Sequence, residues 1–148
     1  MSSKPSLHVR IPPDARHART VRDALAAFST LHGVEKADLD ATLFAVGEAL
    51  ANAIEHGAPS HDIDVTVEID KQLITACIED HGSGFFAMPA AMAPLPDAFS
   101  ERGRGIPIMQ RCMDTFEVRS APGFGTTIML GRFRREGAHR YQEPAAGV

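Results

Sequence analysis

Apolar and polar side chains alternate strictly between residues 62 and 69 of the chain. Ile63, Val65, Val67 and Ile69 occupy one set of positions, and Asp, Thr and Glu occupy the other. A period of two places the apolar set on one face of a β-strand and the polar set on the other. Similar patterns and nearby turn residues predict four more strands, over residues 7–11, 73–79, 116–120 and 126–133.

Two longer segments have apolar residues at spacings of three and four, which is the period of an α-helix. The first segment runs from about residue 14 to 33 and contains Val21, Leu25 and Phe28. The second is expected to begin at Asp38, whose carboxylate would cap the helix N-terminus, and to stop at a glycine and a proline. The apolar stripe of this second helix comprises Leu39, Leu43, Val46, Leu50 and Ile54.

The order of the predicted elements is strand, helix, helix, strand, strand, short helix, strand, strand. The short helix covers residues 106–113, and a segment rich in glycine and proline over residues 82–105 precedes it. Strands that follow one another without crossover helices indicate an antiparallel or mixed sheet. We therefore predict a two-layer α/β (α+β) sandwich, in which helices cover one face of a mixed, mostly antiparallel sheet. Residues 1–6 are expected to be flexible, residues 7–133 to form one domain and residues 134–148 to form a polar tail.

The composition narrows the class of protein. A chain of 148 residues fits one domain, and its net charge of −4 argues against a general nucleic-acid binder. Cys77 and Cys112 lack the spacing of a zinc site, so both are expected to be reduced, buried thiols. No apolar run approaches the roughly 20 residues that span a bilayer, and the N-terminus lacks the apolar core of a signal peptide. We therefore expect a cytoplasmic protein.

Three polar residues stand four positions apart on the second predicted helix: Glu48, Asn52 and His56. This spacing places them on one stripe of the helix, beside the apolar stripe. A carboxylate and an amide oxygen at this spacing can share Mg²⁺ or its water shell, and the carboxylate can accept a proton from an attacking hydroxyl. A solvated polar face has the same spacing, and the pattern taken alone favours that interpretation.

An acid followed by two glycines ends the third predicted strand, at Asp80, Gly82 and Gly84. Glycine lets a backbone approach a ligand closely. An ionised aspartate accepts hydrogen bonds, so Asp80 can bind an exocyclic amine such as that of adenine. A plain tight turn explains the same residues equally well.

Two further pairs of glycines lie next to secondary structure. Gly103 and Gly105 flank Arg104 just before the short helix, where free N–H groups, the helix dipole and a guanidinium suit phosphate oxygens. The second pair, in residues 123–127, opens the last strand and is followed by threonines that can donate to phosphate or water. The alternatives are an ordinary loop end for the first pair and a hairpin turn for the second. The chain has no P-loop and no Gly-x-Gly-x-x-Gly pattern.

The order and spacing of these four segments resemble the N, G1, G2 and G3 boxes of the GHKL ATPases. This superfamily includes gyrase, heat-shock chaperones, histidine kinases and mismatch-repair proteins. Within it, the chain is most similar to the bacterial anti-sigma-factor serine/threonine kinases, because residues 47–57 closely resemble their N box. The resemblance extends over about residues 7–133. It implies the Bergerat-type ATP-binding fold and the cofactors ATP and Mg²⁺.

The resemblance also implies a role for each matching residue. Glu48 would be the general base on a substrate serine, Asn52 would coordinate Mg²⁺, and Asp80 would bind the adenine amine. Residues 85–102 would form a lid over the site. The other residues expected to contact the nucleotide are His56, Gly82, Gly84, Phe85, Gly103, Arg104, Gly105, Ile106 and Thr126.

The function implied by the resemblance is that of an ATP-dependent serine protein kinase and anti-sigma factor. Such a protein phosphorylates a STAS-type anti-anti-sigma partner, sequesters a sigma factor and forms a homodimer. It would contact neither nucleic acid nor a membrane directly. The alternative is a nucleotide-binding switch that sequesters a partner without phosphoryl transfer, because the same boxes bind nucleotide whether or not chemistry follows.

Overall fold

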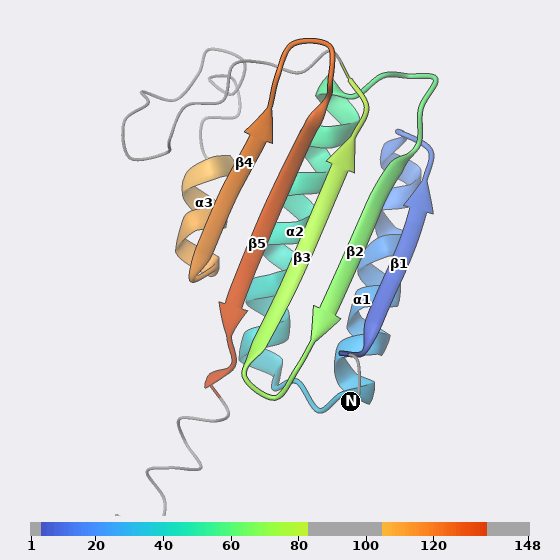
Figure 1. The fold of residues 1–148 in the computed structure, drawn as a ribbon. Coiled ribbons are helices and arrows are strands. Elements are labelled where there is room, and N and C mark those ends of the chain that lie inside the picture. The colour runs from blue at the N-terminus through green and yellow to red at the C-terminus, as the bar shows by residue number, and fades with distance from the viewer. Residues whose placement is uncertain (1–3, 83–104, 136–148) are drawn as a thin grey trace, which may run out of the picture.

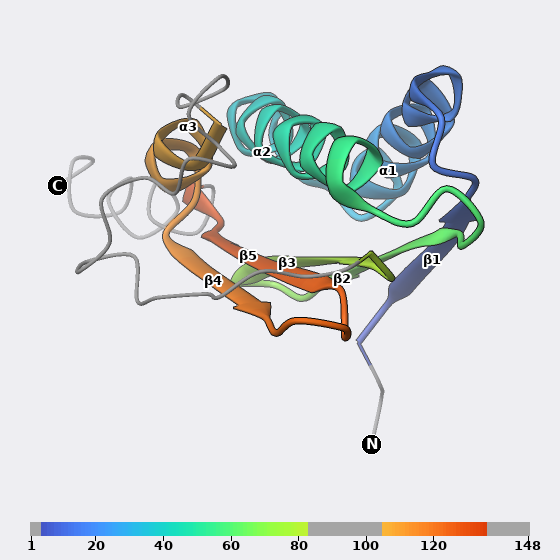
Figure 2. The same ribbon diagram turned by 90° about the horizontal axis from the view of Figure 1, so that it is seen from above.

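The computed structural model describes residues 4–82 and 105–135 of the 148-residue chain. Within these residues, five strands form one sheet and the helices cover one of its faces (Figure 1; Figure 2). No helix among them combines the length and the apolarity needed to span a lipid bilayer. In chain order the elements are β1 (Ser6–Ile11), the 3-10 turn η1 (Ala15–His17), α1 (Ala18–Leu31), α2 (Lys36–His56), β2 (Ile63–Ile69), β3 (Leu73–Asp80), α3 (Gly105–Cys112), β4 (Thr115–Ser120) and β5 (Thr126–Phe133).

The strands lie in the order β1-β2-β3-β5-β4, and each neighbouring pair is antiparallel. The predicted two-layer sandwich with a mostly antiparallel sheet is therefore confirmed, and the part of the sheet that the structure describes contains no parallel pair. The last strand, β5, lies between β3 and β4. This position pairs Thr126, at the start of β5, with Asp80, at the end of β3.

The core lies between the sheet and the helices. In β2 and β3 the alternate apolar residues are buried, as the sequence pattern predicts. On α2, the central buried positions include three alanines, Ala45, Ala49 and Ala53, while Leu39 and Ile54 of the predicted stripe are only half-buried at its margins. Small side chains at the centre let the helix backbone lie close to β3 and β5.

Asp38 does not cap α2, so this prediction is wrong. The helix begins at Lys36, and its N-cap residue Glu35 makes no side-chain capping hydrogen bond. Asp38 lies buried in the first turn and accepts a 2.8 Å hydrogen bond from Nε of Arg132 on β5. Arg132 also donates to the carbonyl oxygen of Cys112 at the end of α3, over 2.7 Å. Local pattern reasoning misses this role because the arginine that pairs with Asp38 comes from the last strand.

The first helix also begins later than its apolar period suggests. The carboxylate of Asp14 accepts a 2.9 Å hydrogen bond from the backbone N–H of Arg16, and it therefore caps the 3-10 turn. The α-helix itself starts at Ala18. Arg134 and Arg135 follow β5 and belong to the predicted polar tail. In the structure their side chains donate hydrogen bonds to backbone and carboxylate oxygens of the folded domain.

Both cysteines are free thiols, but they are half-buried where full burial was expected. Cys77 lies on β3, on the face of the sheet opposite the helices, and Cys112 ends α3. Burial raises the pKa of the Cys77 thiol, and the nearby carboxylate of Glu79 raises it further. Each thiol is therefore partly open to solvent, and Cys77 is held in its neutral form.

Candidate nucleotide-binding site

Three segments that are distant in the sequence meet at one end of the sheet: the C-terminal end of α2, the end of β3 and the start of β5 (Figure 1). Two glycines permit this contact. Gly82 is packed against the carbonyl oxygen of His56, and a Cβ at Gly82 would lie only 2.9 Å from the Cα of Gly57. A Cβ at Gly125 would lie 3.0 Å from the Cα of His81. A larger residue at either position would push the segments apart.

Gly125 is also required by its backbone conformation. Its φ of +76° lies in the left-handed region, where a side chain is strained. Gly57, which sequence reasoning treated only as the helix stop, has a further role because a Cβ there would lie 3.3 Å from the Cβ of Asp80. The sequence feature that could have indicated this role is the position of Gly57 directly after the helix that carries the polar stripe.

Asp80 is the last residue of β3, and only 6% of its surface is exposed. Its Oδ1 accepts a 2.9 Å hydrogen bond from the N–H of Gly82, and the N–H of Thr126 also donates to the carboxylate. Burial raises the pKa of Asp80 above its ordinary value, although these two N–H groups and the nearby histidines His81 and His56 oppose the rise. The acid is thus held by backbone donors in a poorly solvated place.

Thr126 lies opposite Asp80 in the sheet register and is buried. Its hydroxyl is within 2.8 Å of the hydroxyl of Ser120 on β4, and Ser120 donates to the carbonyl oxygen of Gly125 over 3.0 Å. Ser120 therefore holds both Thr126 and the turn that precedes it. Ser120 is not among the predicted site residues. The sequence pattern that could have identified it is a hydroxyl residue that ends one strand of a hairpin and faces a threonine that starts the next.

Asn52 and Glu48 occupy successive turns of α2, as their spacing predicts. Asn52 is only 5% exposed, and its side-chain Nδ2 has no hydrogen-bond partner within residues 4–82 and 105–135. Glu48 and His56 are half-buried on the turns before and after it. Because an unsatisfied buried amide costs about 1–3 kcal/mol, the Asn52 amide fits a ligand that completes its bonding.

Few protein groups at this site could bind a metal ion. Within the residues that the structure places, no cluster of three or more His, Cys, Asp or Glu side chains could hold a metal ion. Mg²⁺ commonly takes only one or two protein oxygens and fills the rest of its octahedron with water and substrate phosphates. Nδ2 of Asn52 is a donor and cannot bind a cation, but the amide oxygen of the same side chain fits the role of one such ligand, with the carboxylate of Glu48 one helical turn away.

Several predicted site residues lie outside the described residues, namely Gly84, Phe85, Gly103 and Arg104, as does the expected lid over residues 85–102. Gly105 and Ile106 form the start of α3, but only their backbone belongs to the described part of the structure. α3 packs alongside α2. The expected contacts of these residues with the nucleotide therefore stay a prediction.

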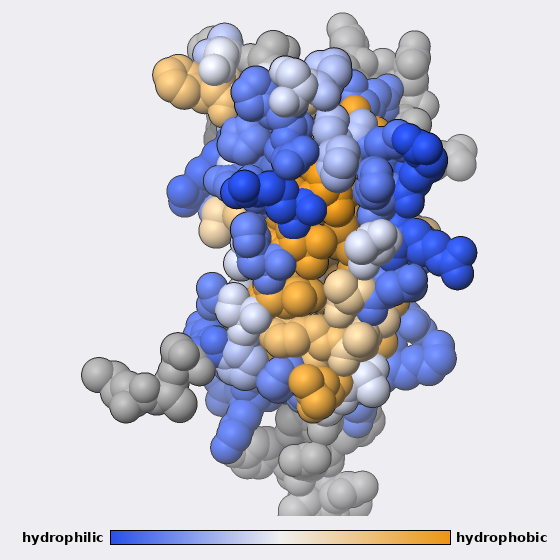
Figure 3. Space-filling view, turned by 90° about the vertical axis from the view of Figure 1, so that its right-hand side faces the viewer, coloured by the Kyte–Doolittle hydropathy of each residue, from blue (hydrophilic) through white to orange (hydrophobic). Residues whose placement is uncertain are grey.

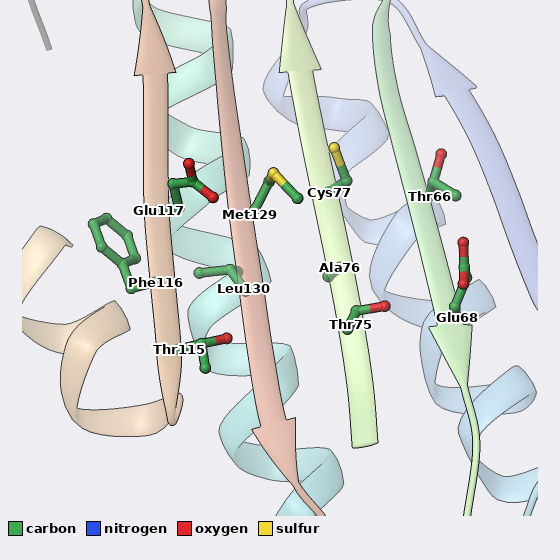
Figure 4. Close-up of a pocket in the computed structure, with 10 residues that line it drawn as sticks. All are labelled: Thr66, Glu68, Thr75, Ala76, Cys77, Thr115, Phe116, Glu117, Met129 and Leu130. Carbon is green, nitrogen blue, oxygen red and sulfur yellow. The ribbon is translucent and has the colours of Figure 1, made fainter. Parts of the chain in front are cut away.

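A hollow of about 470 Å³ lies elsewhere, on the face of the sheet that the helices leave uncovered (Figure 4). Cys77 and Met129 lie side by side on adjacent strands in this hollow, and Glu68 and Glu117 lie on the strands that flank it. Gly131 on β5 adds no side chain to this face of the sheet, which helps to leave it open. None of the predicted site residues lines the hollow.

Comparisons with known proteins identify the family of the chain and its fold. The family model described as "Histidine kinase-like ATPase domain" matches residues 11–131. The anti-sigma F factors of Bacillus cytotoxicus and Bacillus thuringiensis are each 34% identical to the chain over 94 residues, which is 60% of this chain and 64% of the relative. The chain thus spans less than two thirds of the length of these relatives.

A solved structure has the same fold. The crystal structure of the RsbU and RsbW domains of a Mycobacterium tuberculosis protein superposes with a TM-score of 0.69 and 22% identity, over 90% of this chain and 34% of that chain. The family model extends from the end of β1 into β5 and so includes α2, the end of β3 and the start of β5. The chain therefore belongs to the histidine kinase-like ATPase domain family.

Proposed function

We propose that the chain is an ATP-dependent serine protein kinase that also acts as an anti-sigma factor. The observation that carries the proposal is a pair of buried polar side chains near the end of the sheet where α2, β3 and β5 meet. They are the carboxylate of Asp80 and the amide of Asn52, whose Nδ2 lacks a partner among the residues described. Buried polar groups that protein side chains leave unpaired support a polar ligand at this place. Family membership supports ATP as that ligand.

Asp80 would bind the base. Its carboxylate accepts hydrogen bonds from the N–H groups of Gly82 and Thr126, which fix its orientation and leave further lone pairs for an incoming donor. The exocyclic amine of adenine is such a donor. A hydrogen bond to an ionised carboxylate is stronger than one to a neutral carboxyl, so the purine would bind more tightly to the charged form of Asp80.

Glu48 would act on the acceptor. In the transfer, the serine Oγ forms a bond to the γ-phosphorus, the bond from that phosphorus to the β–γ bridging oxygen breaks, and ADP leaves. Glu48 accepts the hydroxyl proton. Mg²⁺ held at the amide oxygen of Asn52 would neutralise charge on the phosphates.

The proposed protein partners are a sigma factor and a STAS-type anti-anti-sigma protein that carries the acceptor serine. The relatives named anti-sigma F factor support the first partner. The second rests on the resemblance of residues 47–57 to the N box of the anti-sigma-factor kinases. We also propose that the protein works in the cytoplasm, where both partners act.

A homodimer is part of this proposal, and the β1 side of the molecule is the surface that supports it. β1 is an edge strand, so one row of its backbone groups faces away from the sheet. Figure 3 shows apolar side chains gathered in a band on this side, between hydrophilic margins. On β1, Leu7 and Val9 are half-buried, and on the adjoining helix α1, Phe28 is half-buried and Leu31 is 78% exposed. A second copy could pair its own edge strand and cover this band.

Glu48→Gln tests the proposed chemistry. The wild-type protein should transfer labelled phosphate from ATP to a STAS-type protein of the same organism. The variant should lose about 10²–10⁴-fold in transfer rate, because it cannot accept the proton, while its ATP affinity changes little. Glu55→Gln, on the exposed side of the same helix, is the matched control and should transfer phosphate normally.

The same experiment separates the alternative function. Partner binding that survives Glu48→Gln unchanged, with no phosphoprotein formed by the wild-type protein on any STAS-type candidate, would select a nucleotide-binding switch over a kinase.

The dimer has its own test in analytical ultracentrifugation. Wild-type protein should sediment as a dimer and Val9→Arg as a monomer, whereas a monomeric wild-type protein would refute the dimer alone.

A further inference from the structure

The turn that joins β4 and β5 carries an exposed aromatic side chain, which is unusual for a loop tip. Its residues are Ala121, Pro122, Gly123, Phe124 and Gly125, without one polar side chain. The first four are exposed to solvent, and Phe124 is 86% exposed. Proline and glycine are ordinary turn residues, whereas a large aromatic side chain exposed at a loop tip is disfavoured unless a function retains it.

Hydrogen bonds and glycine geometry fix the backbone of this turn. The N–H of Phe124 donates to the carbonyl oxygen of Ala121 over 3.0 Å. Gly123 and Gly125 have φ values of +85° and +76°, which glycine adopts readily and other residues adopt at a cost. The hydroxyl of Ser120 donates to the carbonyl oxygen of Gly125 over 3.0 Å. Phe124 is therefore presented on an ordered backbone.

The turn lies at the rim of the candidate nucleotide site. Gly125, next to Phe124, is packed against the backbone of Asp80 and His81. Thr126, two residues after Phe124, is paired with Asp80. In Figure 1 the turn lies at the same end of the sheet as the C-terminal end of α2 and the end of β3. A protein that presents a serine to this end would lie within reach of the turn, since a protein interface covers roughly 800 Å² of each partner.

We propose that Phe124 is a docking contact for the protein that receives the phosphoryl group, with its phenyl ring seated in an apolar pocket of that partner. This inference rests on the proposed function and names a surface used by the STAS-type partner. Burying an exposed aromatic ring removes apolar surface from water, and a ring on a fixed turn loses little conformational freedom on binding. Aromatic side chains of this kind dominate the energetics of many interfaces.

β5 itself supplies a matched control. Phe133, at the other end of the same strand, is 56% exposed and lies far from Asp80 and Thr126. The experiment compares wild type, Phe124→Ala, Phe124→Leu and Phe133→Ala in the full chain. Binding of each to purified STAS-type proteins and sigma factors of the same organism is measured by fluorescence anisotropy, and binding of Mg²⁺-ATP is measured by calorimetry.

We expect Phe124→Ala to weaken binding of the STAS-type protein at least tenfold, with partial recovery in Phe124→Leu and less than a twofold change in Phe133→Ala. Affinity for Mg²⁺-ATP should stay within twofold of wild type in all three variants. The proposal is overturned if Phe124→Ala binds the STAS-type protein like wild type, if it weakens only sigma-factor binding, or if it loses ATP affinity, which would make Phe124 a nucleotide contact. It is also overturned if the wild type binds Mg²⁺-ATP but no STAS-type protein, whereas failure to bind Mg²⁺-ATP refutes the proposed function itself.

Discussion

The two buried acids of the molecule's described part, Asp38 and Asp80, lie at opposite ends of the sheet and are held in different ways. At the end where α2 begins, the buried carboxylate of Asp38 is paired with Arg132, and Arg132 is bonded in turn to the end of α3. On the same side, Asp114 accepts two hydrogen bonds of 2.7 and 3.0 Å from the guanidinium of Arg135. Each of these acids is matched by an arginine of β5 or of the residues just after it.

At the opposite end, the half-buried acid Asp64 is paired with Arg10 over 2.8 Å, but the buried polar groups lack such partners. Asp80 is buried and is held by backbone N–H groups, and no arginine or lysine pairs with it among the residues described. The Nδ2 of Asn52 is buried without a partner there. A ligand is therefore needed at the end of the sheet that holds Asp80 and Asn52. A buried ion pair serves the fold, whereas buried polar groups left without protein partners are typical of a binding site.

Removing Arg132 should break the ion-paired end, with the largest effect on folding. Arg132→Met would leave the buried Asp38 carboxylate without its partner, at a cost of about 3–5 kcal/mol in the free energy of unfolding. Urea unfolding followed by circular dichroism measures it. The double variant Asp38→Leu with Arg132→Met removes both charges and should recover much of the loss. If the single variant is as stable as wild type, the pair does not hold this end together.

Gly125→Ala should strain the site end, with a smaller effect. The positive φ and the contact with the backbone of Asp80 together should cost about 1–3 kcal/mol in unfolding free energy. Gly123→Ala is the matched control, because it has a positive φ but open space around a new Cβ. The difference between the two variants measures the contact with Asp80. Equal losses would show that the close packing of the turn on β3 has no energetic consequence.

Asp80 and Asp114, at opposite ends of the sheet, should also differ in the sign of their contributions to the pH dependence of stability. Burial raises the pKa of Asp80, so its ionisation disfavours the folded state and stability falls as pH rises through that pKa. The hydrogen bonds from Arg135 lower the pKa of Asp114, so its contribution is present above the ordinary aspartate pKa and is lost as pH falls through the lowered one. Carbon-detected NMR titration of the carboxyl groups should find Asp80 above, and Asp114 below, the value of 3.8 for an unperturbed aspartate. The opposite order would remove this contrast.

The local patterns of the sequence predict most of the fold. Alternation in β2 and β3 depends on a single buried face and survives in the structure unchanged. The exception is Asp38, whose position before an apolar stripe favours a cap but whose partner Arg132 lies on the last strand. The buried alanines at the centre of α2 are also missed. A pattern of large apolar residues shows which face of a helix is buried, but it does not show how closely the helix approaches the sheet.

The candidate site is predictable in part for the same reason. Helical spacing places Glu48 and Asn52 on one stripe, and a strand end followed by glycines places Asp80. What the sequence does not show is the packing between segments. The contact of Gly57 with Asp80 and the hydrogen bond from Ser120 to Gly125 depend on β5 lying next to β3, which is a property of the topology.

Calorimetric titration of Mg²⁺-ATP into wild type and Asp80→Asn tests the central claim most directly. Asparagine has nearly the shape of aspartate but lacks the charge and one acceptor, so a hydrogen bond worth about 1.5–3 kcal/mol would be lost and the affinity should fall roughly 10–100-fold. Asp40→Asn, on the exposed first turns of α2, should bind like wild type. A folded wild-type protein that takes up no Mg²⁺-ATP, or an Asp80→Asn variant that binds it unchanged, would contradict the account.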